Sequence, residues 1–294
     1  MQKIITALFI LLIFTAKAQN SSVKPAILYG SIVKEKLQAV PYAKWFDSEY
    51  NAYKSDETIL AQLKKQNLKD VTIQIFFGTW CSDSQKEVPR FFKLLNEIGF
   101  SSDNIHLIAL GNSDSLYKQS PQHEEKGLGI FRVPTIIIYK NGKELNRINE
   151  SPVFSLEKDL LNIITNQPYS SNYPSLKIIK QWLSDSTIAD SNVSVKSLSE
   201  QLKPIINNEN ELNNLGYCLL MGQDTKKEAL KIFKINFNLY HEASNVISSL
   251  GEGFYENGDN ANAILYLEKA LGLIKKPEEV KPILQLLYKV KGIK

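Results

Sequence analysis

Residues 71–89 of this 294-residue chain read Val-Thr-Ile-Gln-Ile-Phe-Phe-Gly-Thr-Trp-Cys-Ser-Asp-Ser-Gln-Lys-Glu-Val-Pro. Residues 71–77 are β-branched and aromatic and end at Gly78, which predicts a buried strand. Beyond the cysteine, apolar residues recur at helical spacing. This predicts an amphipathic helix over residues 84–98, with an apolar face made of Val88, Phe91, Phe92, Leu95 and Ile98. The stretch therefore places Cys81 at a turn between a buried strand and a helix.

Further strand patterns follow. Residues 104–110 and 135–139 predict two more buried strands, and Asn141-Gly142 predicts a hairpin turn to a returning strand over residues 143–148. A last helix is expected from Ser155. The first two strands are joined by a helix and should be parallel, whereas the hairpin pair should be antiparallel. We therefore expect a mixed sheet of at least four strands with helices on both faces.

Three motifs in this region resemble those of the thioredoxin-like fold. The first is the strand that leads into Trp80-Cys81-x-x-Ser84 at the start of a helix, and the second is Pro89 within that helix. The third is Val133-Pro134-Thr135, directly before a strand and a hairpin. In that family the proline of the third motif is cis and packs against the active-site cysteine. The resemblance covers residues 71–164 and implies an α/β thioredoxin-like mixed sheet with flanking helices.

The expected position of Cys81 suits a nucleophile. A thiol at the N-terminal end of a helix faces unpaired N–H groups and the positive end of the helix dipole, and both favour the thiolate. Trp80 is expected to shield one side of the sulfur. The resemblance implies that Val133, Pro134 and Thr135 shape a groove where the backbone of a substrate pairs. The structural alternative is a buried, inert cysteine.

The family usually carries a second cysteine where this chain has Ser84. Without that thiol, Cys81 cannot close a disulfide within the motif, which excludes a full dithiol cycle there. Three roles stay open: exchange through mixed disulfides that an external thiol resolves, disulfide isomerisation, and a domain kept only for binding. Ser84 is expected to support the thiolate by donating a hydrogen bond.

The chain beyond residue 174 carries helical patterns only. Two stretches align, because Leu215-Gly216 matches Leu250-Gly251 and Phe233 matches Leu267. Over residues 209–276 the pattern resembles tetratricopeptide repeats, which place small residues where paired helices touch. Two roles are open for this region: helical packing or dimerisation, and docking of a protein or peptide.

Cysteine and histidine usage limits the chemistry. The chain has two cysteines and three histidines without ligand spacing, so we expect no metal site and no cofactor. Cys218, the other thiol, lies on an apolar helical face and is expected in the core. A disulfide between Cys81 and Cys218 would require their Cα atoms to lie within ~7 Å.

Composition and the N-terminus indicate the compartment. Hydrophobic residues make up 43% and charged residues 22%, which argues against general disorder. The net charge is only +4 and the sequence contains no cluster of basic residues, so no nucleic-acid partner is expected. Residues 1–18 predict a secretory signal peptide, with Lys3 before an apolar run over residues 4–14 that is too short to span a membrane. We expect an exported protein, periplasmic or secreted, cleaved near Ala18.

These patterns divide the chain into a signal peptide (1–18), an irregular lead-in (19–42), a thioredoxin-like domain (43–167), a linker (168–174) and a helical repeat domain (175–294). The expected function is thiol–disulfide exchange on protein substrates through Cys81, with an external resolving thiol and with repeats that dock the partner. The alternative is a non-enzymatic periplasmic adaptor built on a degenerate thioredoxin-like fold.

Overall fold

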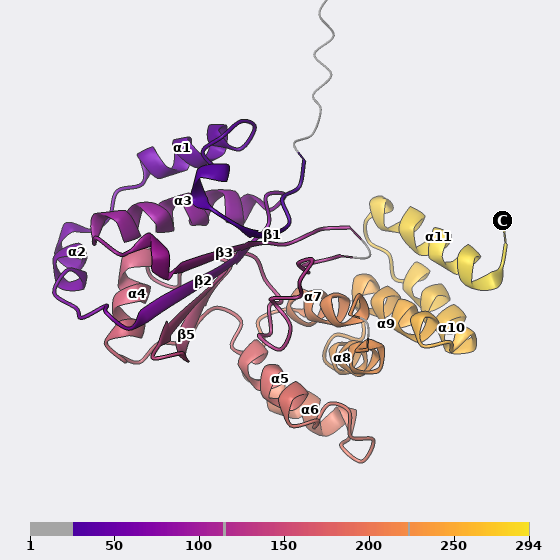
Figure 1. Ribbon diagram of the computed structural model, residues 1–294. Coiled ribbons are helices and arrows are strands. Elements are labelled where there is room, and N and C mark those ends of the chain that lie inside the picture. Colours follow the sequence, from indigo (N-terminus) through magenta and orange to yellow (C-terminus); the bar gives the residue numbers. More distant parts are fainter. Residues whose placement is uncertain (1–25, 114–115, 223, 294) are drawn as a thin grey trace, which may run out of the picture.

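The computed structural model describes residues 26–113, 116–222 and 224–293. A mixed sheet with flanking helices comes first in these residues, and a helical C-terminal region follows it (Figure 1). The expected signal peptide, residues 1–18, lies outside the described residues.

The sheet has five strands in the order β1-β3-β2-β4-β5. The central strand β2 pairs in parallel with β3 and antiparallel with β4, and β4 pairs antiparallel with β5, which confirms the mixed sheet. The elements of this part are β1 (Gly30–Ile32), α1 (Ala43–Ala52), α2 (Glu57–Leu63), β2 (Val71–Phe77), α3 (Ser82–Glu97), β3 (Ile105–Ala109), β4 (Thr135–Lys140), β5 (Lys143–Asn149) and α4 (Leu156–Ile164).

Strand β1 lies in the segment that was expected to be irregular. Gly30 is opposite Ala109 and Ile32 is opposite Leu107 in an antiparallel pair with β3. Three residues are too few to show an alternating pattern, and their pairing depends on the free edge of β3. The sheet therefore begins within residues 19–42.

The two faces of the sheet are covered differently. Alternate residues of β2 point to opposite sides, as in any strand. Ile73, Ile75 and Phe77 join a large buried cluster with side chains from α1, α2, α3 and α4, whereas Phe76 joins a second cluster. We call these sides the helix face and the loop face. The buried members of the loop-face cluster are Phe76, Ile108, Leu110, Ile130, Val133 and Ile137.

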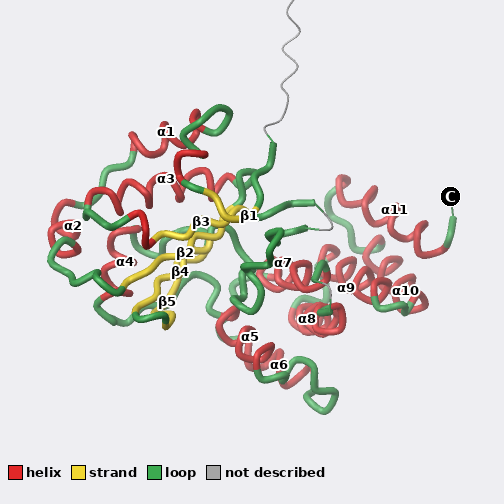
Figure 2. The backbone as a smooth tube through the Cα atoms, in the orientation of Figure 1, coloured by secondary structure: helices red, strands yellow, loops and turns green. Residues whose placement is uncertain are grey.

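The helices that flank the sheet, α1 to α4, pack on the helix face, whereas the loop-face cluster of the described residues contains no side chain from a helix. The segment between β3 and β4 covers this face instead (Figure 2). Pro121 and left-handed backbone at Lys118, His123, Gly127 and Gly129 prevent a continuous helix there.

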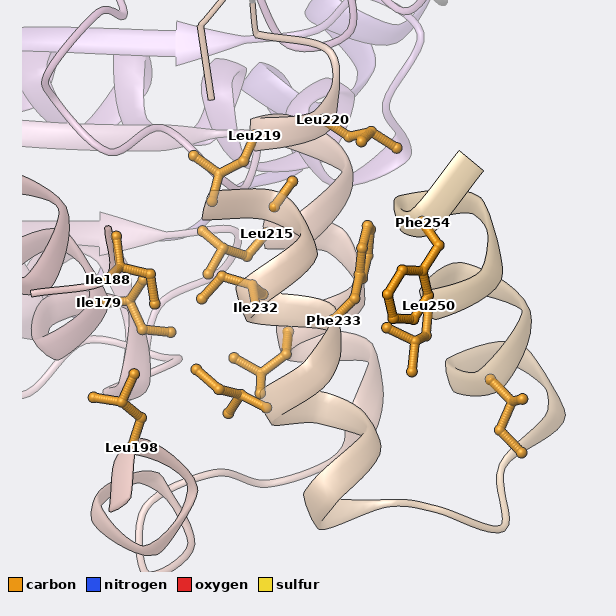
Figure 3. Close-up of a cluster of buried hydrophobic side chains, with 14 of the residues drawn as sticks. Ile179, Ile188, Leu198, Leu215, Leu219, Leu220, Ile232, Phe233, Leu250 and Phe254 are labelled. Atoms are coloured by element: carbon orange, nitrogen blue, oxygen red, sulfur yellow. The ribbon is translucent and has the colours of Figure 1, made fainter. Parts of the chain in front are cut away.

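The helical region begins at Ser175. Its helices are α5 (Ser175–Ser184), α6 (Val195–Leu202), α7 (Glu209–Leu220), α8 (Lys226–Leu239), α9 (Ser244–Glu256), α10 (Asn260–Leu271) and α11 (Val280–Lys291). From α7 onward each helix packs on the next, and Figure 3 shows Phe233 of α8 pointing toward Leu250 and Phe254 of α9.

The two aligned glycines make equivalent helix contacts. A Cβ atom at Gly216 would lie 2.3 Å from the ring of Phe233, and one at Gly251 would lie 2.9 Å from the side chain of Leu267. Only a residue without a side chain allows these helix pairs, α7 with α8 and α9 with α10, to approach so closely. The contact repeats at the spacing that the sequence alignment gave.

The helical region docks on the loop face. Phe131, from the segment before β4, is only 6% exposed and belongs to the buried cluster of the helical region. Gln119 donates a hydrogen bond of 2.9 Å to the carbonyl of Met221, just beyond α7. Lys180 of α5 forms an ion pair of 3.1 Å with Glu144 of β5. The segment that covers the loop face therefore also joins the two parts of the molecule.

Candidate functional site

Cys81 is the N-cap residue of α3. Its backbone is extended (φ −98°, ψ 124°), and its carbonyl accepts the 2.9 Å hydrogen bond from the N–H of Gln85 that begins the helix. The side chain makes no capping hydrogen bond, so the sulfur is not committed to the helix N-terminus. The side chain is half-buried. This is the place that the sequence predicted, at the turn between β2 and α3.

The Val133-Pro134-Thr135 segment lies opposite the sulfur. The Cys81 thiol donates a hydrogen bond of 3.2 Å to the carbonyl of Val133, and the Val133–Pro134 peptide bond is cis. Thr135 is buried and donates from its hydroxyl to the carbonyl of Arg132, at 2.7 Å. The residues expected to form the groove are therefore brought together with Cys81.

Trp80 packs against the loop-face cluster, as Cys81 does. Its indole lies against Gly78 so closely that a Cβ atom there would be 2.6 Å from the ring. The indole N–H donates to the carbonyl of Leu110 at 2.8 Å, and Tyr117 packs on the ring at a centroid distance of 6.3 Å. These contacts fix the indole at the end of β2, and shielding of the sulfur by Trp80 stays a prediction.

Ser84 lies beneath this turn. It is fully buried, and its Oγ accepts a hydrogen bond of 3.1 Å from the N–H of Gly78. Among the described residues, no hydrogen bond joins Ser84 to Cys81. This hydrogen bond links Ser84 to the turn that carries Cys81. The expected support of the Cys81 thiolate by Ser84 stays a prediction.

Charged residues that the sequence did not single out surround the loop. Lys118 is 6% exposed and donates from its ammonium to the carbonyl of Phe131 at 2.9 Å. Arg132 pairs with Glu150 at 3.3 Å. Burial raises the pKa of Glu150, Asp83 adds to this, and the positive charges of Arg132 and Lys118 oppose it. No local pattern marks these residues, because the sheet brings them together across long separations in sequence.

Cys218 lies in α7 and not in the centre of the helical core. It is half-buried and packs against the core cluster, with its Sγ 3.9 Å from the carbonyl of Phe131. Burial raises its pKa, and the charges of Lys118 and Arg132 act against that rise. A cavity of about 470 Å³ between the loop and the helical region borders this thiol, together with Lys118 and Phe131.

The described part of the chain contains no group of three or more histidine, cysteine, aspartate or glutamate side chains placed to hold a metal ion. Within the same residues, no helix combines the length and the apolar character that crossing a membrane requires.

Comparison with protein-family models, with curated proteins and with solved structures finds no match to this chain.

Proposed function

We propose that this chain is an exported thioredoxin-like protein that exchanges disulfides with protein substrates through a single thiol, Cys81. The observation that carries the proposal is the hydrogen bond of 3.2 Å between Cys81 at the start of α3 and the carbonyl of Val133, next to cis-Pro134. The central position of β2, which leads into that helix, supports it as well. The resemblance of Trp80-Cys81 and Val133-Pro134-Thr135 to the family motifs agrees with this arrangement.

The proposed reaction needs one attacking sulfur. The Cys81 thiolate attacks a substrate disulfide, a mixed disulfide forms, and the second substrate sulfur leaves as a thiolate. The unpaired N–H groups at the start of α3 stabilise the anion. The family resemblance implies that the extended chain of a substrate pairs with the backbone around Val133, where the Val133 carbonyl becomes available once the Cys81 thiol ionises. Since Ser84 cannot resolve the mixed disulfide, another thiol must do so.

The helical region is proposed to recruit the partner. Its aligned contacts, Gly216 with Phe233 and Gly251 with Leu267, support a tetratricopeptide-like arrangement. Because Phe131 joins this region to the loop before β4, a partner held by the helices would lie near Cys81. Export through the sequence at residues 1–18 is part of the same proposal.

One observation favours the alternative, a non-enzymatic adaptor. In the hydrogen bond to Val133 the Cys81 sulfur acts as the donor, and this bond is lost when the thiol ionises. An adaptor would keep the fold and the helical docking surface but would not need a reactive sulfur.

The rate of alkylation separates the two functions. In a Cys218→Ser background, Cys81 should react with iodoacetamide at pH 7 at least about tenfold faster in the folded chain than in urea, because thiolates are the reacting form. A rate below that of the unfolded chain would favour the adaptor. As a control, Cys81→Ser in the same background should take up no label.

A further inference from the structure

The two thiols of the chain contact the same loop. The Cys81 sulfur is 3.2 Å from the carbonyl of Val133, and the Cys218 sulfur is 3.9 Å from the carbonyl of Phe131, two residues earlier. Two residues of extended chain span at most about 7 Å, so the two sulfurs are no more than about 14 Å apart. Any bend in the loop brings them closer, and the backbone bends at residues 132–134.

The surroundings of Cys218 differ from those of an inert core cysteine. The Lys118 ammonium, itself more than nine-tenths buried, donates to the same Phe131 carbonyl that Cys218 contacts. Its positive charge favours the thiolate of Cys218, as does that of Arg132, although burial has the larger effect on the pKa of this thiol. The buried ammonium therefore offsets part of the rise in pKa that burial gives the Cys218 thiol.

Cys218 also has room to react. It lines the cavity of about 470 Å³ between the loop and the helical region. The polar contacts of α7 with the loop side include the hydrogen bonds from Gln119 to the carbonyl of Met221 and from Arg132 to the carbonyl of Asn210, at 2.9 and 3.4 Å. Bonds of this kind can be exchanged for bonds to water at small net cost when α7 shifts toward the loop.

We propose that Cys218 is the thiol that resolves the mixed disulfide on Cys81; this inference rests on the proposed function. The chain has two cysteines, so Cys218 is the one intramolecular candidate. The Cys218 thiolate attacks the Cys81 sulfur, the substrate leaves as a thiolate that takes a proton, and a Cys81–Cys218 disulfide forms. The substrate disulfide has then gained two electrons and the cysteine pair has lost two. An external dithiol reductant returns the pair to its starting state.

Burial lowers the reactivity of the Cys218 thiol, but its position in the same chain as Cys81 favours the reaction between the two sulfurs. A group held next to its target reacts as if it were present at a very high concentration. The arrangement also limits side reactions, because a half-buried thiol where α7 meets the loop is less accessible to disulfides in solution than an exposed one. In this proposal the helical region provides the second thiol, which the motif lacks because Ser84 stands in place of a cysteine.

Titration of the reduced full chain with a dipyridyl disulfide tests this. With half an equivalent of reagent at low protein concentration, the wild-type chain should release two thiopyridones for each reagent molecule. Peptide mapping should then find Cys81 joined to Cys218 within one chain. Cys218→Ser should release one thiopyridone and keep a pyridyl adduct on Cys81.

A matched pair of variants tests the role of the buried ammonium. Lys118→Met should slow the second release about tenfold and leave the first unchanged, because a lower thiolate fraction slows attack by Cys218 alone. Lys126, an exposed lysine that lines the same cavity, is the control, and Lys126→Met should leave both releases unchanged.

The outcomes are distinguishable. If the wild-type chain keeps the pyridyl adduct on Cys81 as Cys218→Ser does, or if the cross-link joins two chains, Cys218 is not the resolving thiol, while exchange through Cys81 stands. If Cys81 does not react with the reagent, the proposed function fails together with this inference.

Discussion

The helix face and the loop face of the sheet differ in what covers them. Four helices cover the helix face, and the cluster there contains large, fully buried side chains such as Phe46, Phe77 and Phe91. The loop-face cluster is smaller and lies under an irregular segment that carries the Val133 carbonyl, Lys118 and the contact with α7. The comparison indicates that the helix face contains most of the buried apolar packing of the sheet, whereas the loop face carries the residues of the proposed site.

This division has a physical reason. Within a helix the backbone N–H and carbonyl groups bond to one another, so the carbonyls are not available to accept hydrogen bonds from neighbouring side chains. In the irregular segment the backbone carbonyls have no helical partner, so they can accept hydrogen bonds from side chains. Three consecutive carbonyls do so, those of Phe131 (from Lys118), Arg132 (from Thr135) and Val133 (from Cys81). Segments with few buried apolar contacts also open at a lower free-energy cost. Under the proposed function, a face that admits a substrate is better covered by a loop than by packed helices.

The largest effect is expected on the helix face. Phe91 is completely buried there, and Phe91→Ala should lower the free energy of unfolding by about 4 kcal/mol, through lost burial and a cavity. Urea unfolding of the full chain measures this. Phe154→Ala, at a phenylalanine that is 66% exposed, is the control and should change stability by less than about 0.5 kcal/mol. The comparison of the faces would be wrong if Phe91→Ala cost less than a substitution on the loop side.

A smaller effect is expected for Phe131, which joins the loop to the helical core. Phe131→Ala should cost about 3 kcal/mol, at the lower end of the range for buried phenylalanine. Its effect should be local, since the side chain packs with the helical region and not with α1–α4. Hydrogen exchange should therefore accelerate in α7 and remain unchanged in β2. Equal acceleration in both would show that the two parts unfold as one unit.

The sequence predicted the elements with long patterns. β2, β4 and α3 were expected close to their observed bounds because each carries an apolar pattern, and β5 was expected because the Asn141-Gly142 turn predicts a returning strand. Local capping also follows from the sequence: Asp56, a residue type that favours the N-cap position, caps α2 by accepting from two backbone N–H groups. Cys81 and Val133 could be brought together in advance because family motifs mark both.

Features that depend on long-range docking could not be predicted. β1 is too short to show a pattern, and the position of Cys218 follows from how α7 packs on a loop far away in the chain. Lys118 looks like any lysine of a polar loop until the fold buries it beside Phe131. The loop that covers one face could not be predicted for a related reason: a strand pattern indicates that a side chain is buried, not what covers it.

The smallest effect concerns the ion pair that links the two parts at their edge. Burial alone would raise the pKa of Glu144, but its bonds with Arg147 and the charge of Lys180 outweigh burial, and the pKa is lowered. Because the pKa of Glu144 is lower in the folded chain than its ordinary value of 4.5, its ionised form stabilises the fold. This contribution is fully present above pH 4.5 and is lost as the pH falls through the lowered pKa. The Lys180 side chain is 36% exposed, so solvent screening keeps its share small.

Lys180→Met should therefore cost about 0.5 kcal/mol at pH 7, and the difference from the wild-type chain should disappear in acid once Glu144 is protonated. Lys177→Met, at an exposed lysine of the same helix, should show no such pH dependence. Urea unfolding at several pH values measures both. A difference that persists in acid would mean that Lys180 acts through packing against the loop at Gly129, where its methylene groups lie close to the backbone, and not through its charge.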